Sequence, residues 1–332
     1  MYILFFIIFN FFLLVNFKHI KIFHINIDKP DKKRKFHKKP TPLAGGVLIF
    51  INILIYTFFS LFFSDILDQK IFLNFKNFLN FIIIASIIFL IGFYDDKLNI
   101  RSNIKFFLLI IVIFFLLQLD ENFIISQLNF SFSNAKINLN EYSIPFTIFA
   151  YLVFLNAFNM FDGINLQSGI YSFIILISIS ILYVESNFIK ILIISLLSFL
   201  YLNYKDLSFL GDSGTLLISF IISCIFILLY NVKKITYADD IAIFMLIPGL
   251  DLIRLFITRI IYKKNPLNPD RNHLHHLLLK KNSEQKSLII ITMLIVLPIL
   301  LNMFKFNNLI SLILVIVLYS FFCFKRKLIK FL

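Results

Sequence analysis

Acidic residues close several of the long apolar runs in this sequence. Asp95 and Asp96 follow Gly-Phe-Tyr at the end of one run, Asp162 precedes Gly163 at the end of another, and Asp212 lies in Gly-Asp-Ser-Gly after a third. Ionisable groups at the edge of a membrane are costly and usually serve a function. Carboxylate oxygens bind Mg²⁺, so these acids are candidates for metal-dependent chemistry on phosphate groups.

Imidazole and basic side chains could supply the complementary half of such chemistry. His273, His275 and His276 lie within four residues and follow Arg271, in a segment that also carries lysines. Imidazoles can bind a metal, move a proton or contact a phosphate. Because the surroundings are cationic and Mg²⁺ prefers oxygen ligands, we expect the histidines to contact phosphates.

Each motif also has a plain structural explanation. The Asp pair could be a solvated helix end, Asp-Gly an ordinary turn, and the histidines a solvated surface. Asp212 or Ser213 could cap the following helix. Asp251 and Arg254, three residues apart on one helix face, are expected to form a structural ion pair. Chemistry is favoured because the polar clusters come from four separate loops that are expected to face one compartment.

The composition describes a membrane protein. Of 332 residues, 60% are hydrophobic and only 15% are charged, which excludes an ordinary water-soluble fold. The two cysteines, Cys224 and Cys323, lie inside apolar runs, so a disulfide framework is excluded. The net charge of +14 falls mostly between apolar runs. It therefore indicates membrane topology, and no nucleic-acid partner is expected.

The elements that must position these residues are membrane-spanning helices. The fold class that we predict is an all-α polytopic membrane protein with eleven transmembrane helices in a single domain, 1–332. A small β-hairpin is predicted within 120–144, with strands at Phe130–Phe132 and Lys136–Leu139. The eleven predicted spans are 1–17, 43–63, 78–94, 106–119, 145–161, 169–184, 188–204, 215–230, 241–261, 288–304 and 309–324.

Charges in the loops predict the orientation. Of the 32 Lys and Arg, 23 fall in one alternating set of loops and seven in the other, and positively charged loops stay in the cytoplasm. This places the N-terminus outside, the C-terminus inside, and all acid and histidine motifs at the cytoplasmic face. The first span has no basic residue before it and no cleavage site after it, so we expect it to be retained as a helix.

Five short motifs follow one another along the chain, namely Lys39–Gly46, Asp95-Asp96, Asn156–Gly163, Phe209–Gly214 and His273–His276. Taken in this order, they resemble those of the polyprenyl-phosphate N-acetylhexosamine-1-phosphate transferases. His-x-His-His after Pro-Asp-Arg is similar to the branch that initiates surface glycans, which uses N-acetylglucosamine, rather than to the phospho-MurNAc-pentapeptide transferases of peptidoglycan synthesis.

The resemblance implies Mg²⁺-dependent transfer of a sugar-1-phosphate from a UDP-sugar to undecaprenyl phosphate at the cytoplasmic face of the bacterial inner membrane, with release of UMP. Mn²⁺ could replace Mg²⁺, and a homodimer is left open. It also makes Asp212 the metal ligand, with Asp95 and Asp96 beside the metal and Asp95 a base or a phosphate-positioning group. The substrate-binding residues that it implies are Lys38, Lys39, Asn156, Asn159, Asp162, Asn203, Phe209, Arg271, His273, His275 and His276.

Two positions depart from the family pattern, and three other functions stay open. Asn99 stands where the family often has a third acid, and Asn165-Leu166 stands in place of a second Asp-Gly, which affects the expected donor sugar more than the reaction. The alternatives are a phospho-MurNAc-pentapeptide transferase-like enzyme, a membrane transporter and a lipid-phosphate hydrolase. A transporter would place its polar residues near the middle of the spans, whereas here they lie at the ends.

Overall fold

A computed structural model describes residues 2–30, 39–63, 70–133, 135–263 and 272–328, with side chains described as far as Cys323. Two predicted substrate-binding residues, Lys38 and Arg271, lie outside these ranges. In the described part of the chain, helices dominate and the strands are only two or three residues long.

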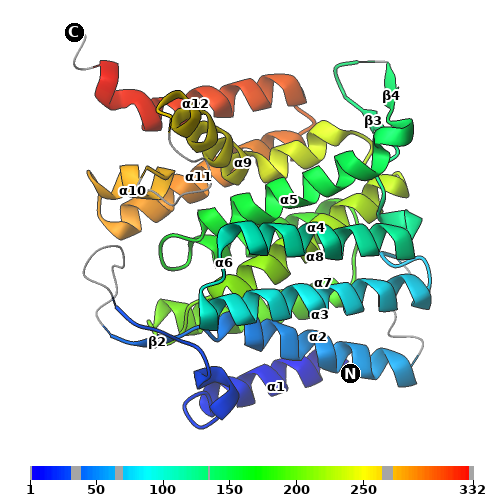
Figure 1. Cartoon of the computed structure of the whole chain (residues 1–332), viewed down its shortest axis with the longest axis vertical. Coiled ribbons are helices and arrows are strands. Elements are labelled where there is room, and N and C mark those ends of the chain that lie inside the picture. The colour runs from blue at the N-terminus through cyan, green and yellow to red at the C-terminus, as the bar shows by residue number, and fades with distance from the viewer. Residues whose placement is uncertain (1, 31–38, 64–69, 134, 264–271, 329–332) are drawn as a thin grey trace. The chain divides into compact units, whose positions relative to one another are not determined.

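The predicted fold class is confirmed, because each of the eleven predicted spans coincides with a helix. Eight of the helices in the described ranges are long and apolar enough to cross a membrane, so the chain is a multi-pass membrane protein. Three shorter apolar stretches are also helical, Tyr2–Val15, Gln167–Leu182 and Asn308–Cys323. The helices (Figure 1) are α1 (Tyr2–Val15), α2 (Gly45–Phe62), α3 (Phe75–Leu98), α4 (Ser102–Leu119), α5 (Ser143–Phe161), α6 (Gln167–Leu182), α7 (Asn187–Tyr204), α8 (Gly211–Asn231), α9 (Ala238–Ile261), α11 (Glu284–Met303) and α12 (Asn308–Leu328).

Polar side chains mark where several of these helices begin. Asn74 precedes α3 and accepts a hydrogen bond from the backbone N–H of Asn77 at 2.8 Å. Ser186 caps α7 in the same way through the N–H of Ile189. A capping oxygen satisfies one of the backbone donors that a helix leaves open in its first turn. The starts of α3 and α7 therefore coincide with local capping residues.

The predicted hairpin is present, but its first strand lies earlier than predicted. Strands β3 (Gln127–Asn129) and β4 (Lys136–Asn138) pair antiparallel, with Leu128 opposite Ile137. The predicted strand at 130–132 is wrong because side-chain hydrogen bonds hold that segment out of the ladder. The backbone N–H and the hydroxyl of Ser131 both donate to the Asp239 carboxylate. A second short pair, β1 (Ile27–Asp28) with β2 (Thr41–Pro42), was not predicted.

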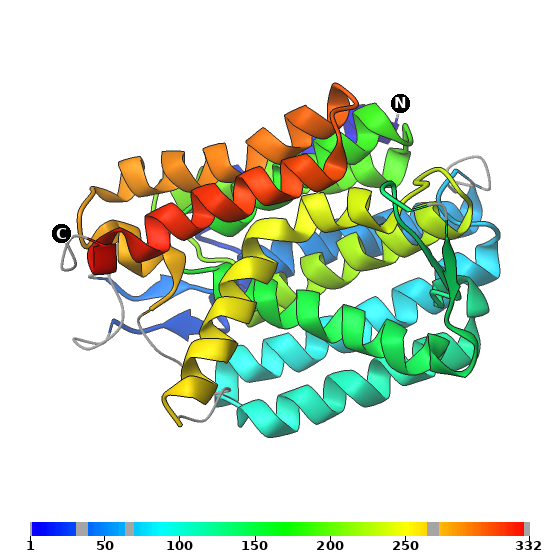
Figure 2. The ribbon, with the colours of Figure 1, turned by 90° about the horizontal axis from the view of Figure 1, so that it is seen from above.

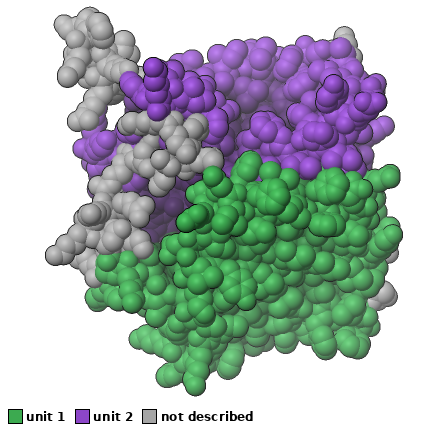
Figure 3. All heavy atoms as spheres, viewed as in Figure 1, with its two compact units in different colours: residues 1–123, 168–228 green, residues 124–167, 229–332 purple. Residues whose placement is uncertain are grey.

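The chain divides into two compact units, coloured separately in Figure 3. Unit 1 holds 1–123 and 168–228, and unit 2 holds 124–167 and 229–332. The chain thus passes from unit 1 to unit 2 and back again before it ends in unit 2, and composition gave no sign of this division. The single domain over 1–332 stays a prediction.

Unit 1 packs helices from both of its chain segments against one another. Helix α7 lies against α1 and α2, and α3 lies between α2 and α4 (Figure 1). In the apolar run of α8, every residue of the most hydrophobic window is buried. A helix that is apolar on all sides belongs in the interior. The first turn of α8 carries Asp212, so a buried helix positions that acid.

Unit 2 is built around α9, which packs against α5, α11 and α12. Helix α9 contains Pro248 and changes direction along its length (Figure 2). Proline lacks the N–H that would complete the helix ladder and its ring crowds the preceding turn, so a bend is expected there. The short helix α10 (Leu274–Leu279) begins directly after His273, contains His275 and His276, and packs against α11 and α12.

Candidate active site

An acidic cluster in unit 1 brings together the ends of three helices. The Lys105 ammonium of α4 contacts Asp95 Oδ2 of α3 at 2.6 Å and Asp212 Oδ2 of α8 at 3.0 Å. The Asp95 side chain is 6% exposed and that of Asp212 is 34% exposed. One cation therefore holds two carboxylates, the buried one and the more accessible one, at one point.

Local structure fixes the orientation of Asp95. Helix α3 ends at Leu98, and the next residue, Asn99, has a left-handed backbone (φ 51°), which asparagine tolerates better than most residues. The turn brings the N–H of Ile100 to Asp95 Oδ1 at 2.7 Å, and Oδ2 remains for Lys105. Asn99, which replaces an expected acid, thus serves the turn that orients Asp95.

Asp96 has a different environment from Asp95. Its Oδ1 accepts the N–H of Asp212 at 2.7 Å, and its Oδ2 accepts the N–H and the hydroxyl of Ser213 at 3.1 and 2.7 Å. These donors belong to the first turn of α8, where the helix dipole also favours a negative charge. Asp96 thus caps α8 from a neighbouring helix. A catalytic or metal-binding role for Asp96 stays a prediction.

Gly211 permits this capping contact. It has a φ of +75°, a region in which side chains are strained, and a Cβ at this position would lie 2.7 Å from Asp96 Oδ2. The glycine that starts the Gly-Asp-Ser-Gly motif therefore serves the geometry of the helix start and leaves room for the carboxylate.

Backbone hydrogen bonds join two of the predicted motifs. Gly45 and Gly46 donate to the carbonyls of Phe209 and Leu210, each at 3.0 Å, and the N–H of Phe209 donates to Pro42 at 2.9 Å. The buried Asn203 amide donates to the carbonyl of Ser208 at 2.8 Å. Asn203 therefore supports the loop that carries the half-buried Phe209. The exposed Lys39 begins the segment to which this loop is joined.

The carboxylates fit a magnesium site of the kind that substrate phosphates complete. Among the described residues, no group of three acidic, histidine or cysteine side chains could enclose a metal ion. Mg²⁺ usually keeps several water ligands and takes one or two carboxylates together with substrate phosphates. Asp95 and Asp212, which share one cation, match this donor set, whereas the oxygens of Asp96 accept three hydrogen bonds and its place at the metal stays a prediction.

The three histidines form a second cluster, in unit 2. The rings of His273 and His275 lie parallel, 5.5 Å apart, and the ring of His276 lies 4.3 Å from that of His275. The Nδ1 of His273 lies 2.9 Å from Asp251 Oδ2. The predicted ion pair of Asp251 with Arg254 is present at 2.8 Å, but the Asp251 carboxylate also binds the histidine segment.

His275 is buried against the Asp-Gly motif of the same unit. A Cβ at Gly163 would lie 2.1 Å from the His275 ring, so only glycine leaves space for the imidazole. Burial, with the neighbouring His276 and His273, lowers the pKa of His275 to about 3. His275 is therefore neutral at physiological pH, so it can contact a phosphate as a hydrogen-bonding imidazole but not as a cation.

The other predicted residues of unit 2 lie at the end of α5 and in the turn after it. Asn156, Asn159 and Asp162 are half-buried, and the Asn156 amide donates to the carbonyl of Leu152 in its own helix. These residues share unit 2 with the histidines, whereas the acidic cluster belongs to unit 1. That all of them form one site stays a prediction.

The turn after Asp162 contains two energetically unfavourable features that were not predicted. Leu166 has a φ of 69°, which is rare for a residue with a branched side chain. Gln167 is 1% exposed, and neither atom of its amide has a hydrogen-bond partner among the described residues. Strained backbone and unsatisfied polar groups are more frequent at functional sites.

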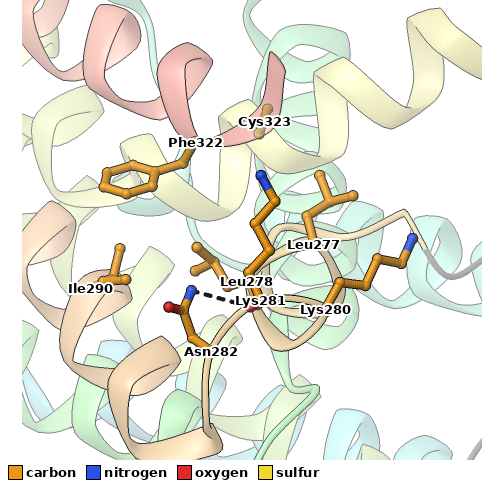
Figure 4. A pocket seen from close by; sticks show the side chains of 8 residues that line it. All are labelled: Leu277, Leu278, Lys280, Lys281, Asn282, Ile290, Phe322 and Cys323. Carbon is orange, nitrogen blue, oxygen red and sulfur yellow. Dashed lines mark hydrogen bonds between the residues drawn. The ribbon is translucent and has the colours of Figure 1, made fainter. Parts of the chain in front are cut away.

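Unit 2 also contains a pocket. It has a volume of about 210 Å³ and is lined by the end of α10, the start of α11 and the described end of α12 (Figure 4). Lys280 and Lys281 lie at it beside Phe322 and Cys323. No residue predicted to carry chemistry lines this pocket, so it does not bear on the site assignment.

Sequence reasoning missed two residues that the structure places in these clusters. Lys105 is not among the predicted site residues, yet it joins Asp95 to Asp212. A lysine in the first turn of a span is a signal that could have identified it. Asp251 was expected to pair with Arg254 alone, and its contact with His273, 22 positions away, has no signal in the sequence.

Comparison with known proteins identifies relatives. Residues 78–230, from α3 to α8, match Glycosyl transferase family 4. The undecaprenyl-phosphate alpha-N-acetylglucosaminyl 1-phosphate transferase of Yersinia pestis is 27% identical over 286 residues, covering 80% of this chain and 73% of that protein. The protein of the same name from Thermotoga maritima is 28% identical over 267 residues, covering 80% and 77%. The resemblance predicted from the motifs is thus confirmed: the segment from α3 to α8 is similar to Glycosyl transferase family 4, and four-fifths of the chain is similar to undecaprenyl-phosphate alpha-N-acetylglucosaminyl 1-phosphate transferases.

Proposed function

We propose that this protein transfers N-acetylglucosamine-1-phosphate, or a closely related N-acetylhexosamine-1-phosphate, from a UDP-sugar to undecaprenyl phosphate. The reaction takes place at the cytoplasmic face of a bacterial inner membrane and begins the synthesis of a surface glycan. Support comes from the activity after which the relatives are named, from their similarity over 80% of the chain, and from the acidic cluster.

The chemistry is a displacement at phosphorus. An oxygen of the lipid phosphate attacks the donor phosphorus that carries the sugar, and a new P–O bond forms. The bond between that phosphorus and the oxygen of the UMP group breaks, and UMP leaves with the electron pair. Because three phosphate groups meet, the main demand on the protein is to hold and neutralise negative charge.

The observation that carries the proposal is the Asp95–Lys105–Asp212 arrangement. Asp95 and Asp212 would hold Mg²⁺, or Mn²⁺ in its place, and the bound metal supplies charge neutralisation for the phosphates. Lys105 offers an ammonium group to the same phosphates, and Asp95, fixed by Ile100, is oriented to position the attacking phosphate or accept its proton.

Binding of the donor is assigned to the remaining motif residues. The nucleotide is proposed to contact Asn159, Asp162 and Phe209. The phosphates or the sugar of the donor are proposed to contact His273, His275 and His276. As a neutral imidazole, His275 acts as a hydrogen-bonding group rather than a cation. Hydrogen bonds that strengthen as charge moves onto the leaving UMP favour the transition state.

A doubly labelled donor tests the proposal. Membranes that contain the protein are incubated with undecaprenyl phosphate and UDP-GlcNAc carrying ³H in the sugar and ³²P in the sugar-bound phosphate. We expect both labels in the lipid fraction and unlabelled UMP in solution, and neither label in the lipid with Asp212→Asn membranes. Sugar without ³²P in the lipid would indicate glycosyl transfer, labelled sugar phosphate or inorganic phosphate in solution would indicate a hydrolase, and intact donor would contradict an enzyme; each would overturn the proposal.

A further inference from the structure

The Asp251 carboxylate lies at the centre of a buried network in unit 2. Asp251 is 3% exposed, and its Oδ1 accepts hydrogen bonds from Arg254 Nη2 at 2.8 Å, from the Tyr319 hydroxyl at 2.7 Å and from the N–H of Leu274 at 3.0 Å. Its Oδ2 lies 2.9 Å from His273 Nδ1. A simple ion pair needs only Arg254, so three of these four contacts need another explanation.

The network also holds the backbone on both sides of His273. Arg254 Nη2 donates to the carbonyl of Asn272 at 2.6 Å, and the N–H of Leu274 donates to Asp251. Arg254 Nε donates to the hydroxyl of Tyr319, which in turn donates to Asp251. Side chains of α9 and α12 therefore hold the backbone of the residue before and the residue after His273, which fixes the position of the Cα atom from which the ring extends.

The contact with Oδ2 sets the tautomer of the ring. A carboxylate can only accept, so the proton shared with it belongs to Nδ1, and the Nε2 of a neutral His273 is left as the unprotonated nitrogen. The parallel ring of His275, 5.5 Å away, limits rotation of the imidazole. When a neighbouring group forms a hydrogen bond with one ring nitrogen of a functional histidine, it fixes the orientation of the ring and the role of the other nitrogen.

We infer that Asp251 is a positioning residue for the transfer reaction, which holds His273 in the Nδ1-protonated tautomer and directs its Nε2, a hydrogen-bond acceptor, to a hydroxyl or N–H group on the sugar of the UDP-sugar. This inference rests on the proposed function. Asp251 itself touches no substrate. Arg254 and Tyr319 keep its buried charge compensated, and the effect on the reaction passes through His273.

Kinetics of matched variants test the inference on the full-length protein. Asp251→Asn should lower kcat for sugar-phosphate transfer by about 10- to 100-fold, the range seen when outer partners of a working histidine are changed. Asp251→Glu, which keeps the charge and moves the oxygens, should recover part of the loss. Tyr319→Phe removes one bond from Oδ1 and leaves the Oδ2–His273 contact, so its kcat should fall much less.

A double-mutant cycle separates positioning from mere stability. In a His273→Ala background, neither Asp251→Asn nor Asp251→Glu should lower kcat further, because the residue through which Asp251 acts is gone. An equal fall of kcat with and without His273, or an Asp251→Asn variant with the rate of the unmodified protein, would overturn the inference. If the Asp251→Asn variant fails to fold, Asp251→Glu takes its place in the double-mutant cycle.

Spectra that need no activity separate this inference from the proposed function. In ¹⁵N spectra of histidine-labelled protein, the signal that disappears in His273→Ala should be that of an Nδ1-protonated ring. This signal should change in Asp251→Asn and persist in Tyr319→Phe. An Nε2-protonated ring in the unmodified protein would overturn the inference. If no label reaches the lipid but the spectra behave as expected, the proposed reaction fails while the positioning of His273 by Asp251 stands.

Discussion

Three acids of unit 1 divide their roles by their contacts rather than by their residue type. Asp95 and Asp212 share the Lys105 ammonium, whereas Asp96 spends both oxygens on the first turn of α8. Asp96 accepts hydrogen bonds only from the start of a helix, so it contributes to the stability of the fold. Asp95 and Asp212 face an ammonium group, and a metal ion could take its place. The adjacent residues Asp95 and Asp96 are therefore expected to have different roles.

Lys105→Met should lower transfer activity strongly while the protein still folds. The ammonium is the positive group between two carboxylates, and loss of one charge-stabilising donor in a phosphate site costs about 100-fold or more in kcat. The measurement is kcat with the labelled donor. Lys97→Met, an exposed lysine on α3, is the matched control. Equal effects of the two substitutions would place Lys105 outside the site.

Asp96→Asn and Asp212→Asn should fail in different ways. Asp212→Asn should abolish transfer and its response to Mg²⁺ with little change in the thermal midpoint, because a metal ligand is lost while a partly exposed ion pair adds little stability. Asp96→Asn should lower the free energy of unfolding by about 1–2 kcal/mol through the weakened cap.

Thermal unfolding in detergent and Mg²⁺ titrations on both variants provide the measurements. A near-normal rate for Asp212→Asn at low Mg²⁺ would remove that residue from the metal site. A thermal midpoint of Asp96→Asn equal to that of the unmodified protein would remove the capping role.

The buried His275 makes stability depend on pH. Its pKa in the folded protein is about 3, below the ordinary value of 6.5. Between these two pH values the unfolded chain binds a proton at His275 and the folded protein does not. Stability is therefore complete above about pH 6.5 and falls toward pH 3, by at most about 1.4 kcal/mol per pH unit from this residue. His275→Asn should show a shallower fall over that window. The difference between the two unfolding curves is the measurement, and identical slopes would contradict the burial of a neutral ring.

At the scale of elements, the turn between α5 and α6 keeps a backbone shape that its sequence does not favour. Leu166 stands where the family often has glycine, yet it adopts the left-handed conformation (φ 69°) that suits glycine. In the same turn, Gly163 lies against the His275 ring. The turn between α5 and α6 therefore keeps Leu166 in a backbone conformation that leucine does not favour, which leaves local strain.

Leu166→Gly should relieve this strain. A left-handed backbone costs an ordinary residue about 1–2 kcal/mol, and the greater freedom of glycine in the unfolded chain takes back about 0.4–1 kcal/mol. We expect a small rise in the thermal midpoint. Leu166→Ala retains a Cβ, so it should show no rise, and equal midpoints for the two variants would mean that the strain is absent.

At the scale of the whole molecule, the distribution of charge predicts topology, with 23 of 32 Lys and Arg in one set of loops. Reporter fusions after Arg34, Asn99 and Lys280 should report the cytoplasm. Fusions after Asp68, Asn134 and Asn187 should report the outside. If the acid and histidine loops reported opposite faces of the membrane, a reaction that uses both would be impossible.

The sequence by itself determined the helices and the family. Inside a membrane every backbone polar group must be satisfied within its own element, so the length of an apolar run nearly dictates a helix. The eleven predicted spans therefore coincide with helices to within a few residues at each end. The motif order was sufficient for the resemblance because each motif is local in the chain.

Only the tertiary structure decided which side chains meet. Lys105 and Asp212 are 107 positions apart, Asp96 caps a helix that begins more than 100 positions later, and Asp251 meets His273 and Tyr319 across 22 and 68 positions. Such contacts depend on how helices pack, and packing depends on the shapes of many side chains at once, which no single motif encodes. The residue types indicated the kind of chemistry. The role of each residue depended on the packing of α3, α4 and α8 in unit 1 and of α9 and α12 in unit 2.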